Sequence, residues 1–133
     1  MQTGRTYPLS AIAVLGICSR KYTPRKYDIL AELPAGAVRL LEDAPPEAAH
    51  ARCIWIRCSS TAVLPRYLTW LLNTEEYRRM RKRICRDCIL SEQMLVRYGA
   101  IRVRLPAPEQ QEFMALIGEG AAAQRHDAGD PFR

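Results

Sequence analysis

The chain has few of the residues and patterns that support catalysis, and no pattern typical of a membrane span. It contains only two histidines, His50 and His126, and neither has a plausible serine or cysteine partner by sequence pattern. It has no glycine-rich phosphate loop and no HExxH motif. It also has no run of about 18 apolar residues, so no transmembrane helix is expected. We therefore expect a protein that is not an enzyme, with no catalytic residues and no cofactor.

The N-terminal region lacks the features of a secretory signal. Its apolar run, Ala11 to Cys18, is short, and Arg20 and Lys21 follow it without a small-residue cleavage pattern. The whole chain of 133 residues is 48% hydrophobic and 26% charged, as in soluble globular proteins. This length is enough for one domain with a real core. A cytoplasmic location is the default expectation.

Five cysteines are present, an odd number, and without a signal peptide we do not expect a disulfide framework. Four of them form two pairs, Cys53 with Cys58 and Cys85 with Cys88, which makes them weak candidates for a zinc site. The first pair is loosely spaced in a strand-like segment, and no glycine adjoins either pair. A redox role for the second pair is disfavoured, because a helix C-terminus raises a thiol pKa. Unpaired thiols are the preferred interpretation.

Periodicity and turn signals predict an α+β fold with a small mixed sheet and segregated helices. Strands are expected at residues 37–41, 52–58 and 100–105, and helices at 9–16, 92–99 and from Leu64, Glu75 and Pro108. Pro65 fits the first turn of its helix, and Ser10, Thr74 and Ser91 are expected as helix caps.

Some side chains are assigned to the core at this stage. Trp55 and Trp70 are expected there, and Phe113, Leu116 and Ile117 are expected to face inward from the last helix. Residues 118–133 are rich in glycine, alanine and charge, so a disordered tail is expected there. Residues 1–117 would then form a single domain.

The chain is basic, with a net charge of +6 and a pI of about 9.3, and basic proteins attract polyanions. The segment from Arg78 to Arg104 contains nine lysines and arginines and only two acidic residues. Candidate nucleic-acid contacts fall into three groups: Arg20, Lys21, Arg25 and Lys26, interleaved with Tyr22 and Tyr27; Arg78, Arg79, Lys82 and Arg83; and Arg102 and Arg104 on one strand face. Cations interleaved with aromatic rings are typical of nucleic-acid loops. For each group the alternative is an ordinary solvated surface.

Several short motifs follow one another between Leu64 and Ile117. They are Pro65-Arg66-Tyr67-Leu68 with Leu71-Leu72-Asn73-Thr74, then Leu90-Ser91, then Val103-Arg104-Leu105-Pro106-Ala107-Pro108-Glu109-Gln110-Gln111. This order resembles the second half of a target recognition domain from the DNA-specificity subunit of type I restriction–modification systems. The Leu-Pro-x-Pro-Glu-Gln-Gln end is the most specific part of the resemblance, and the N-terminal half of the chain matches only faintly.

The resemblance implies a mixed α/β domain that reads one half of a split DNA site in the major groove and does no chemistry. The partners it implies are double-stranded DNA and a methyltransferase subunit or other defence-complex protein, and a half-subunit could form a homodimer. The leading hypothesis is therefore a DNA-binding specificity module. The second is a protein-interaction adaptor or inhibitor in a phage-defence or CRISPR context that reuses the fold. The third is a zinc-stabilised nucleic-acid-binding domain.

Overall fold

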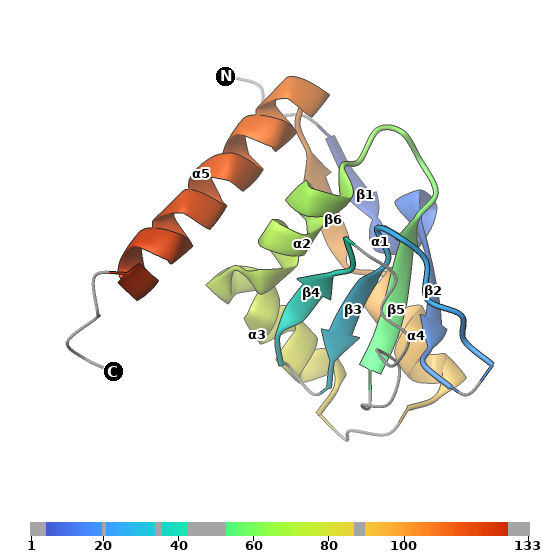
Figure 1. Ribbon diagram of the computed structural model, residues 1–133. Helices are drawn as coiled ribbons and strands as arrows, with labels where there is room; N and C mark the ends of the chain where they lie inside the picture. Colours follow the sequence, from blue (N-terminus) through green and yellow to red (C-terminus); the bar gives the residue numbers. More distant parts are fainter. Residues whose placement is uncertain (1–4, 20, 34–35, 43–52, 87–89, 128–133) are drawn as a thin grey trace.

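The computed structural model describes residues 5–19, 21–33, 36–42, 53–86 and 90–127, with side chains described as far as Gly118. Over these residues the fold is α+β, as predicted, and the expected single mixed sheet is instead two antiparallel sheets (Figure 1). The elements are β1 (Arg5–Pro8), α1 (Leu9–Ile12), β2 (Ala13–Ile17), β3 (Ile29–Glu32), β4 (Val38–Leu40), β5 (Cys53–Cys58), α2 (Pro65–Asn73), α3 (Glu75–Ile84), α4 (Glu92–Gly99), β6 (Arg102–Leu105) and α5 (Pro108–Asp127).

The larger sheet has the strand order β2-β5-β3-β4. Successive side chains of a strand point to opposite faces, so β5 contributes to two clusters. Ile54 and Ile56 are fully buried in the main core with Ile29 and Ala31 of β3. The other face carries a small cluster of Leu30, Leu41 and Cys53, against which Cys18, Tyr22 and Trp55 pack. The strand expected for residues 52–58 is confirmed from Cys53 to Cys58, while residue 52 lies outside the described residues. Both faces of the sheet carry apolar packing.

The predicted N-terminal helix at residues 9–16 is wrong in extent. Helix is confined to the single turn α1, and the chain then enters β2, which pairs with β5 through Ala13↔Cys58 to Ile17↔Ile54. Ser10 lies inside that turn and is not its cap, because Pro8 occupies the capping position. Tertiary pairing has overridden the local preference for helix.

The smaller sheet joins β1 to β6, from Arg5↔Leu105 to Pro8↔Arg102. Val103 and Leu105 are buried while Arg102 and Arg104 are exposed, so the predicted alternation is confirmed. The helices also bond to β6: the Tyr67 hydroxyl donates to the Arg104 carbonyl at 2.7 Å and the Tyr77 hydroxyl to the Arg102 carbonyl at 2.8 Å. These two tyrosines therefore hold α2 and α3 against β6.

Only some of the predicted helix-terminal features are present in the structure. Pro65 lies in the first turn of α2, and the Ser91 hydroxyl accepts a hydrogen bond from the Met94 N–H at 3.1 Å, both as predicted. Thr74 precedes α3 as expected, but its hydroxyl donates to the Leu71 carbonyl at 2.7 Å and does not cap α3. Arg81 lies in the basic last turn of α3, yet only 1% of it is exposed.

The orientation predicted for the last helix is wrong. Phe113, Leu116 and Ile117 are 65%, 53% and 57% exposed. The face that packs on α2 instead contains Gln111, Ala115 and Gly118, spaced i, i+4 and i+7. A Cβ atom on Gly118 would lie 1.9 Å from Nε1 of Trp70, so only glycine permits this close approach.

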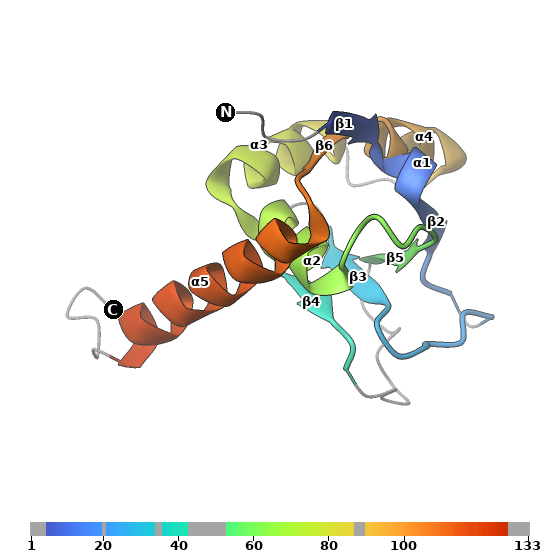
Figure 2. The same cartoon turned by 90° about the horizontal axis from the view of Figure 1, so that it is seen from above.

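Within the segment expected as a disordered tail, the backbone of α5 continues to Asp127, and residues 128–133 lie outside the described residues. Residues 121–125 are three alanines, a glutamine and an arginine, all good helix formers. Figures 1 and 2 both show the C-terminal half of α5 projecting away from the rest of the fold. Among the described helices, none has the length and apolar character needed to cross a bilayer.

Candidate nucleic-acid interface

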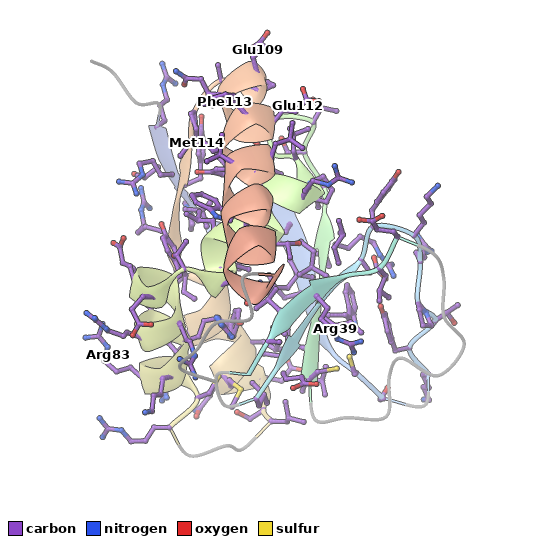
Figure 3. The ribbon with its side chains drawn as sticks, turned by 60° about the vertical axis from the view of Figure 1, so that its left-hand side comes forward. Arg39, Arg83, Glu109, Glu112, Phe113 and Met114 are labelled. Atoms are coloured by element: carbon purple, nitrogen blue, oxygen red, sulfur yellow. The ribbon has the colours of Figure 1, made fainter. Side chains whose placement is uncertain are left out.

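Four cations gather at the C-terminal half of α3 and the turn that follows it. Arg79, Lys82, Arg83 and Arg86 line a single surface hollow, which we call the α3 basic surface. Arg79 and Arg83 are spaced i, i+4 on α3, so helix geometry places them on one face, and Arg86 joins them from the turn after the helix. Figure 3 shows Arg83 extending outward from the body of the protein. No acidic residue lines this hollow among the described side chains, and Arg79 pairs with the exposed Glu75 one turn earlier on α3 at 3.3 Å. The remaining excess of positive charge suits the hollow to an anion.

The opposite face of α3 is anchored in the core. Tyr77 is 4% exposed, and Arg81 donates from Nε to the Leu72 carbonyl at 3.0 Å and from Nη1 to the Gly36 carbonyl at 3.1 Å. These contacts tie α3 both to the end of α2 and to the chain between β3 and β4. Arg79, Lys82 and Arg83 therefore lie on a helix that is fixed to the core, so only their own side chains need to be ordered when a ligand binds.

A second hollow lies on the face of the larger sheet that carries Trp55. It is lined by Lys21, Tyr22, Arg25, Trp55 and Arg57, together with Gly16, Ile17, Ser19 and Thr23, and we call it the sheet surface. The Tyr22 and Trp55 rings are stacked, with centroids 5.5 Å apart and planes 8° from parallel. The Arg57 Cζ atom lies 4.9 Å from the Trp55 ring centroid, which is cation–π geometry.

Gly16 makes room for this stack. It lies directly across from Trp55 in the β2–β5 register, and a Cβ atom on it would stand 2.3 Å from Cζ2 of the indole. The Trp55 ring therefore lies over the glycine backbone, in a place that no larger residue allows without moving the ring.

Asp28 is a buried hydrogen-bond acceptor for the residues of the sheet surface. This residue is only 1% exposed, and its carboxylate accepts two hydrogen bonds from Arg57 at 2.8 Å, one from the Tyr22 hydroxyl at 2.7 Å and one from the Arg25 N–H at 2.9 Å. Burial alone would raise the Asp28 pKa, but the bonds from Arg57 and Tyr22 outweigh it and hold the pKa below its ordinary value. The carboxylate therefore stays charged and fixes one arginine and one aromatic ring.

We predict that Asp28→Asn lowers the free energy of unfolding at pH 7 by about 2 kcal/mol. This value is reduced from that of a fully buried pair, because the Arg57 side chain is 28% exposed. An acid whose pKa is depressed by folding stabilises the protein above its unfolded pKa of about 4, and this stability is lost as the pH falls through the folded pKa.

Urea unfolding at pH 7 and at acid pH measures both effects. Glu42→Gln is the matched control, because the Glu42–Arg66 pair is exposed on both sides and spans 3.5 Å; it should change stability by less than about 0.5 kcal/mol. Equal losses in the two variants would contradict the assignment of Asp28 as an anchor.

The other predicted contact residues are distributed as follows. Lys26 Nζ lies 5.2 Å from the Tyr27 ring centroid, Arg102 donates to the carbonyl and hydroxyl of Thr6 at 3.2 and 3.3 Å, and Arg78 and Arg104 are exposed without lining either hollow. Arg20 lies outside the described residues. Figures 1 and 2 place α3 and the segment that follows β2 on different flanks of the fold. The predicted cations therefore do not converge on one face.

Two members of the basic surfaces were not among the predicted contacts. Arg86 could have been found from its place just after the basic helix, since it lies two residues beyond the end of α3 at Ile84. Arg57 could not have been assigned to the loop that contains Lys21 and Arg25, because it comes from a strand more than 30 residues away and only the sheet register brings it there.

The proposed zinc ligands are not brought together. Cys53 and Cys58 begin and end β5, so a rise of roughly 3.3 Å per residue separates them by about 16 Å, and their odd spacing places them on opposite faces. Cys85 is buried beside the Met94 sulfur at 3.9 Å, and Cys88 lies outside the described residues. Within the described part of the chain, no three His, Cys, Asp or Glu side chains are placed to hold a metal ion.

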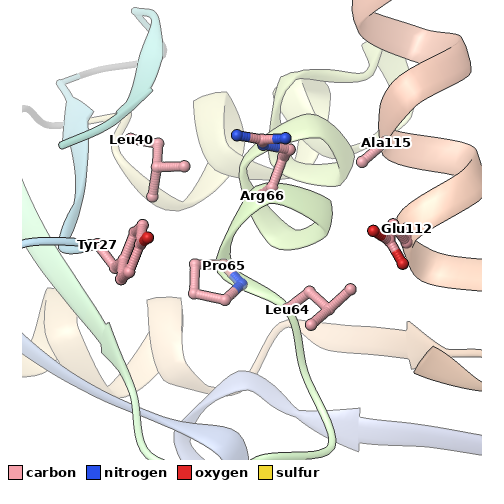
Figure 4. A pocket seen from close by; sticks show the side chains of 7 residues that line it. All are labelled: Tyr27, Leu40, Leu64, Pro65, Arg66, Glu112 and Ala115. Carbon is pink, nitrogen blue, oxygen red and sulfur yellow. The ribbon is translucent and has the colours of Figure 1, made fainter. Parts of the chain in front are cut away.

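A further pocket lies where the end of β4 meets α2 and α5 (Figure 4). Its lining residues are Tyr27, Leu40, Leu64, Pro65, Arg66, Glu112 and Ala115. Tyr27 has a φ of 73°, in the left-handed region that non-glycine residues rarely adopt, where the chain turns into β3. Most of the lining is apolar or aliphatic, and the pocket brings no nucleophile beside a base within the described residues.

No family model matches the chain, and no significant match was found among the curated proteins or the solved structures.

Proposed function

We propose that this chain is a non-catalytic DNA-binding specificity module, similar to half of a type I restriction–modification specificity subunit. It would work in the cytoplasm on double-stranded DNA, beside a methyltransferase subunit or another defence-complex protein. The α3 basic surface carries this proposal, because four cations line one hollow and no acidic residue lines it with them among the described side chains. Arg79, Lys82 and Arg83 lie within about 6 Å along α3, and Arg86 follows in the turn after the helix, so one phosphate for each cation gives about four phosphate contacts.

The segment that resembles the specificity subunit is also held together at its two ends. Gln111 accepts from the Leu64 N–H at 2.9 Å and donates to the carbonyls of Ala62 and Pro106 at 2.7 and 2.8 Å. The last glutamine of the Leu-Pro-x-Pro-Glu-Gln-Gln motif thus joins the start of α2 to the start of α5. This contact supports the proposal, because it gives the motif that carries the resemblance a role in holding the fold together.

The proposal predicts a strongly salt-dependent affinity for duplex DNA. If the α3 basic surface contacts about four phosphates, binding should weaken about 100-fold between 50 and 200 mM salt. Replacing three of its cations together, in an R79Q/K82Q/R83Q variant, should make the slope of log affinity against log salt concentration shallower. The change should correspond to the loss of about three phosphate contacts. Fluorescence anisotropy with a labelled duplex measures both effects.

Arg97→Gln is the matched control, because Arg97 is an exposed arginine on α4 that lines neither basic surface. This variant should bind like the unmodified chain. An affinity that is independent of salt, or an R97Q variant that loses as much as the triple variant, would refute the proposed interface.

A second candidate function is a protein-interaction adaptor or inhibitor in a phage-defence or CRISPR context. The observation that favours it is the outward face of α5, where Phe113 and Ile117 are more than half exposed and Met114 is 36% exposed. Figure 3 shows Phe113 and Met114 on one side of this helix and Glu112 on the other. Exposed apolar patches of this kind commonly mark interaction sites. A flat salt response in the DNA titration, with a stoichiometric protein partner, would favour this function.

A further inference from the structure

Two cysteines face each other where the β2–β5 ladder ends. Cys18 follows β2 and Cys53 begins β5, and the antiparallel register, which runs as far as Ile17↔Ile54, places them opposite one another at the next position. The Cys18 N–H donates to the Cys53 carbonyl at 3.1 Å, so the backbones remain paired at this point. The two sulfur atoms are only 2.6 Å apart, closer than the sulfur atoms of an ordinary thiol–thiol hydrogen bond.

This placement is close to the one that a covalent bond requires. A disulfide joins sulfur atoms about 2.05 Å apart on residues whose Cα atoms are about 4.4 to 6.8 Å apart, and directly opposed residues of an antiparallel pair meet that second condition. Bond formation therefore needs a sulfur displacement of only about half an ångström. Since 35 residues separate the two cysteines in sequence, their proximity is a product of the fold.

The environment distinguishes the two sulfurs. The hydrogen bond with Cys18 lowers the Cys53 pKa against the effect of burial, and the positive charge of Arg39 lowers it further. The same hydrogen bond, together with burial, raises the Cys18 pKa. Arg39 is on the same sheet face as Cys53. Leu30 of β3 lies opposite both Arg39 and Trp55, so these three side chains share a face. Cys53 is two residues from Trp55 on β5 and therefore points to that face as well. Cys53 is 1% exposed and Cys18 is only partly buried, so a reagent reaches the pair through Cys18.

We propose that Cys18 and Cys53 are an oxidisable pair that forms a reversible intramolecular disulfide by exchange with a low-molecular-weight disulfide such as oxidised glutathione. The reagent first forms a mixed disulfide with Cys18 and releases one glutathione thiol. The Cys53 sulfur then attacks the Cys18 sulfur and expels the second glutathione. Overall, two protein thiols give up two electrons and two protons, and the reagent's S–S bond is reduced to two thiols.

The bond would lie next to the sheet surface, in the small cluster where Cys18, Tyr22 and Trp55 pack against Cys53. It would fix the segment that carries Lys21 and Tyr22 to the start of β5, beside the Tyr22–Trp55 stack. Cys58 and Cys85 cannot take part in the same exchange, since Cys58 is at the far end of β5 and Cys85 is buried beside Met94. The proposal concerns a modification site and does not depend on DNA binding.

The test is oxidation of the reduced, full-length protein with oxidised glutathione, followed by acid quenching, thiol counting under denaturing conditions and peptide mapping without reductant. The expected result is a fall from five thiols to three, with a mass loss of two hydrogen atoms and a peptide that links Cys18 to Cys53. Dithiothreitol should restore all five thiols. Cys58→Ser, the matched control on the same strand, should still lose two thiols, and Cys18→Ser should lose no pair.

Two results would overturn the proposal. One is a lasting adduct with the mass of glutathione on Cys18 and no linked peptide, which would show that Cys53 does not complete the exchange. The other is an internal link that includes Cys58, Cys85 or Cys88. Mapping of the unsubstituted chain decides between these results even if a cysteine variant folds poorly.

Discussion

Replacing Gln111 with alanine is expected to lower the free energy of unfolding by about 4 kcal/mol. Gln111 is fully buried, and its amide satisfies the Leu64 N–H and the carbonyls of Ala62 and Pro106. Each buried polar group that loses its partner costs about 1 to 3 kcal/mol. The expected loss is a large part of the total stability of about 5 to 15 kcal/mol that is typical of a domain.

The neighbouring residue provides the control. Gln110 has the same side chain in the same turn of α5 and is exposed, so Gln110→Ala should change stability by less than about 0.5 kcal/mol. Urea denaturation followed by circular dichroism measures both variants. Similar midpoints for the two variants would show that the Gln111 hydrogen bonds do not hold α5 to α2.

The second large effect is expected at Arg81. Arg81→Ala should cost about 3 kcal/mol, because it opens a cavity and removes the donors to the carbonyls of Leu72 and Gly36. Part of the loss is offset because the native site buries a cation, with no described partner for its Nη2. Arg81→Met fills most of the volume but restores no hydrogen bond, so its cost should lie between zero and that of alanine.

The adjacent Lys82→Ala is the control for Arg81, since Lys82 is exposed on the same helical turn. Lys82→Ala should leave the unfolding midpoint unchanged and weaken DNA binding. The Arg81 variants should lower the unfolding midpoint and, at temperatures where they remain folded, bind DNA like the unmodified chain. Thermal melts and anisotropy titrations separate these readouts. Loss of stability in K82A comparable to that in R81A would contradict the division of α3 into a core face and a ligand face.

The sequence predicted the elements whose signals are local. The alternation of β6, the proline in the first turn of α2 and the Ser91 cap each depend on neighbouring residues, and each is confirmed. Strand order could not be predicted in the same way. β3 lies between β5 and β4, although β4 precedes β5 in the chain, and only long-range pairing decides this arrangement.

The errors have a common physical origin. The inward face of α5 was assigned to Phe113 and Ile117 because they are apolar, but the space beside Trp70 admits only small residues such as Gly118. Likewise, Arg81 cannot be told from Lys82 in sequence, since burial of an arginine depends on which carbonyls happen to face it. In both cases the shape and polarity of a distant partner decided the outcome.

The sequence predicted which types of residue form the candidate interface. It did not predict how those residues are arranged. Arg79, Lys82 and Arg83 gather on one helix face as helical spacing requires, whereas Lys21 and Arg25 lie on a separate surface with a distant arginine and tryptophan. Which basic segments share a surface depends on the register of β2 with β5, and a single sequence contains no signal for that register.

The hydroxyls of Tyr67 and Tyr77 have a consequence for self-association. They donate to the carbonyls of Arg104 and Arg102 on the side of β6 that faces away from β1. Burial raises the pKa of Tyr67 to about 12, so this hydroxyl remains a donor at every physiological pH. An incoming strand from another molecule would find those acceptors already engaged, and the small sheet is therefore protected against the edge-to-edge growth that leads to aggregation.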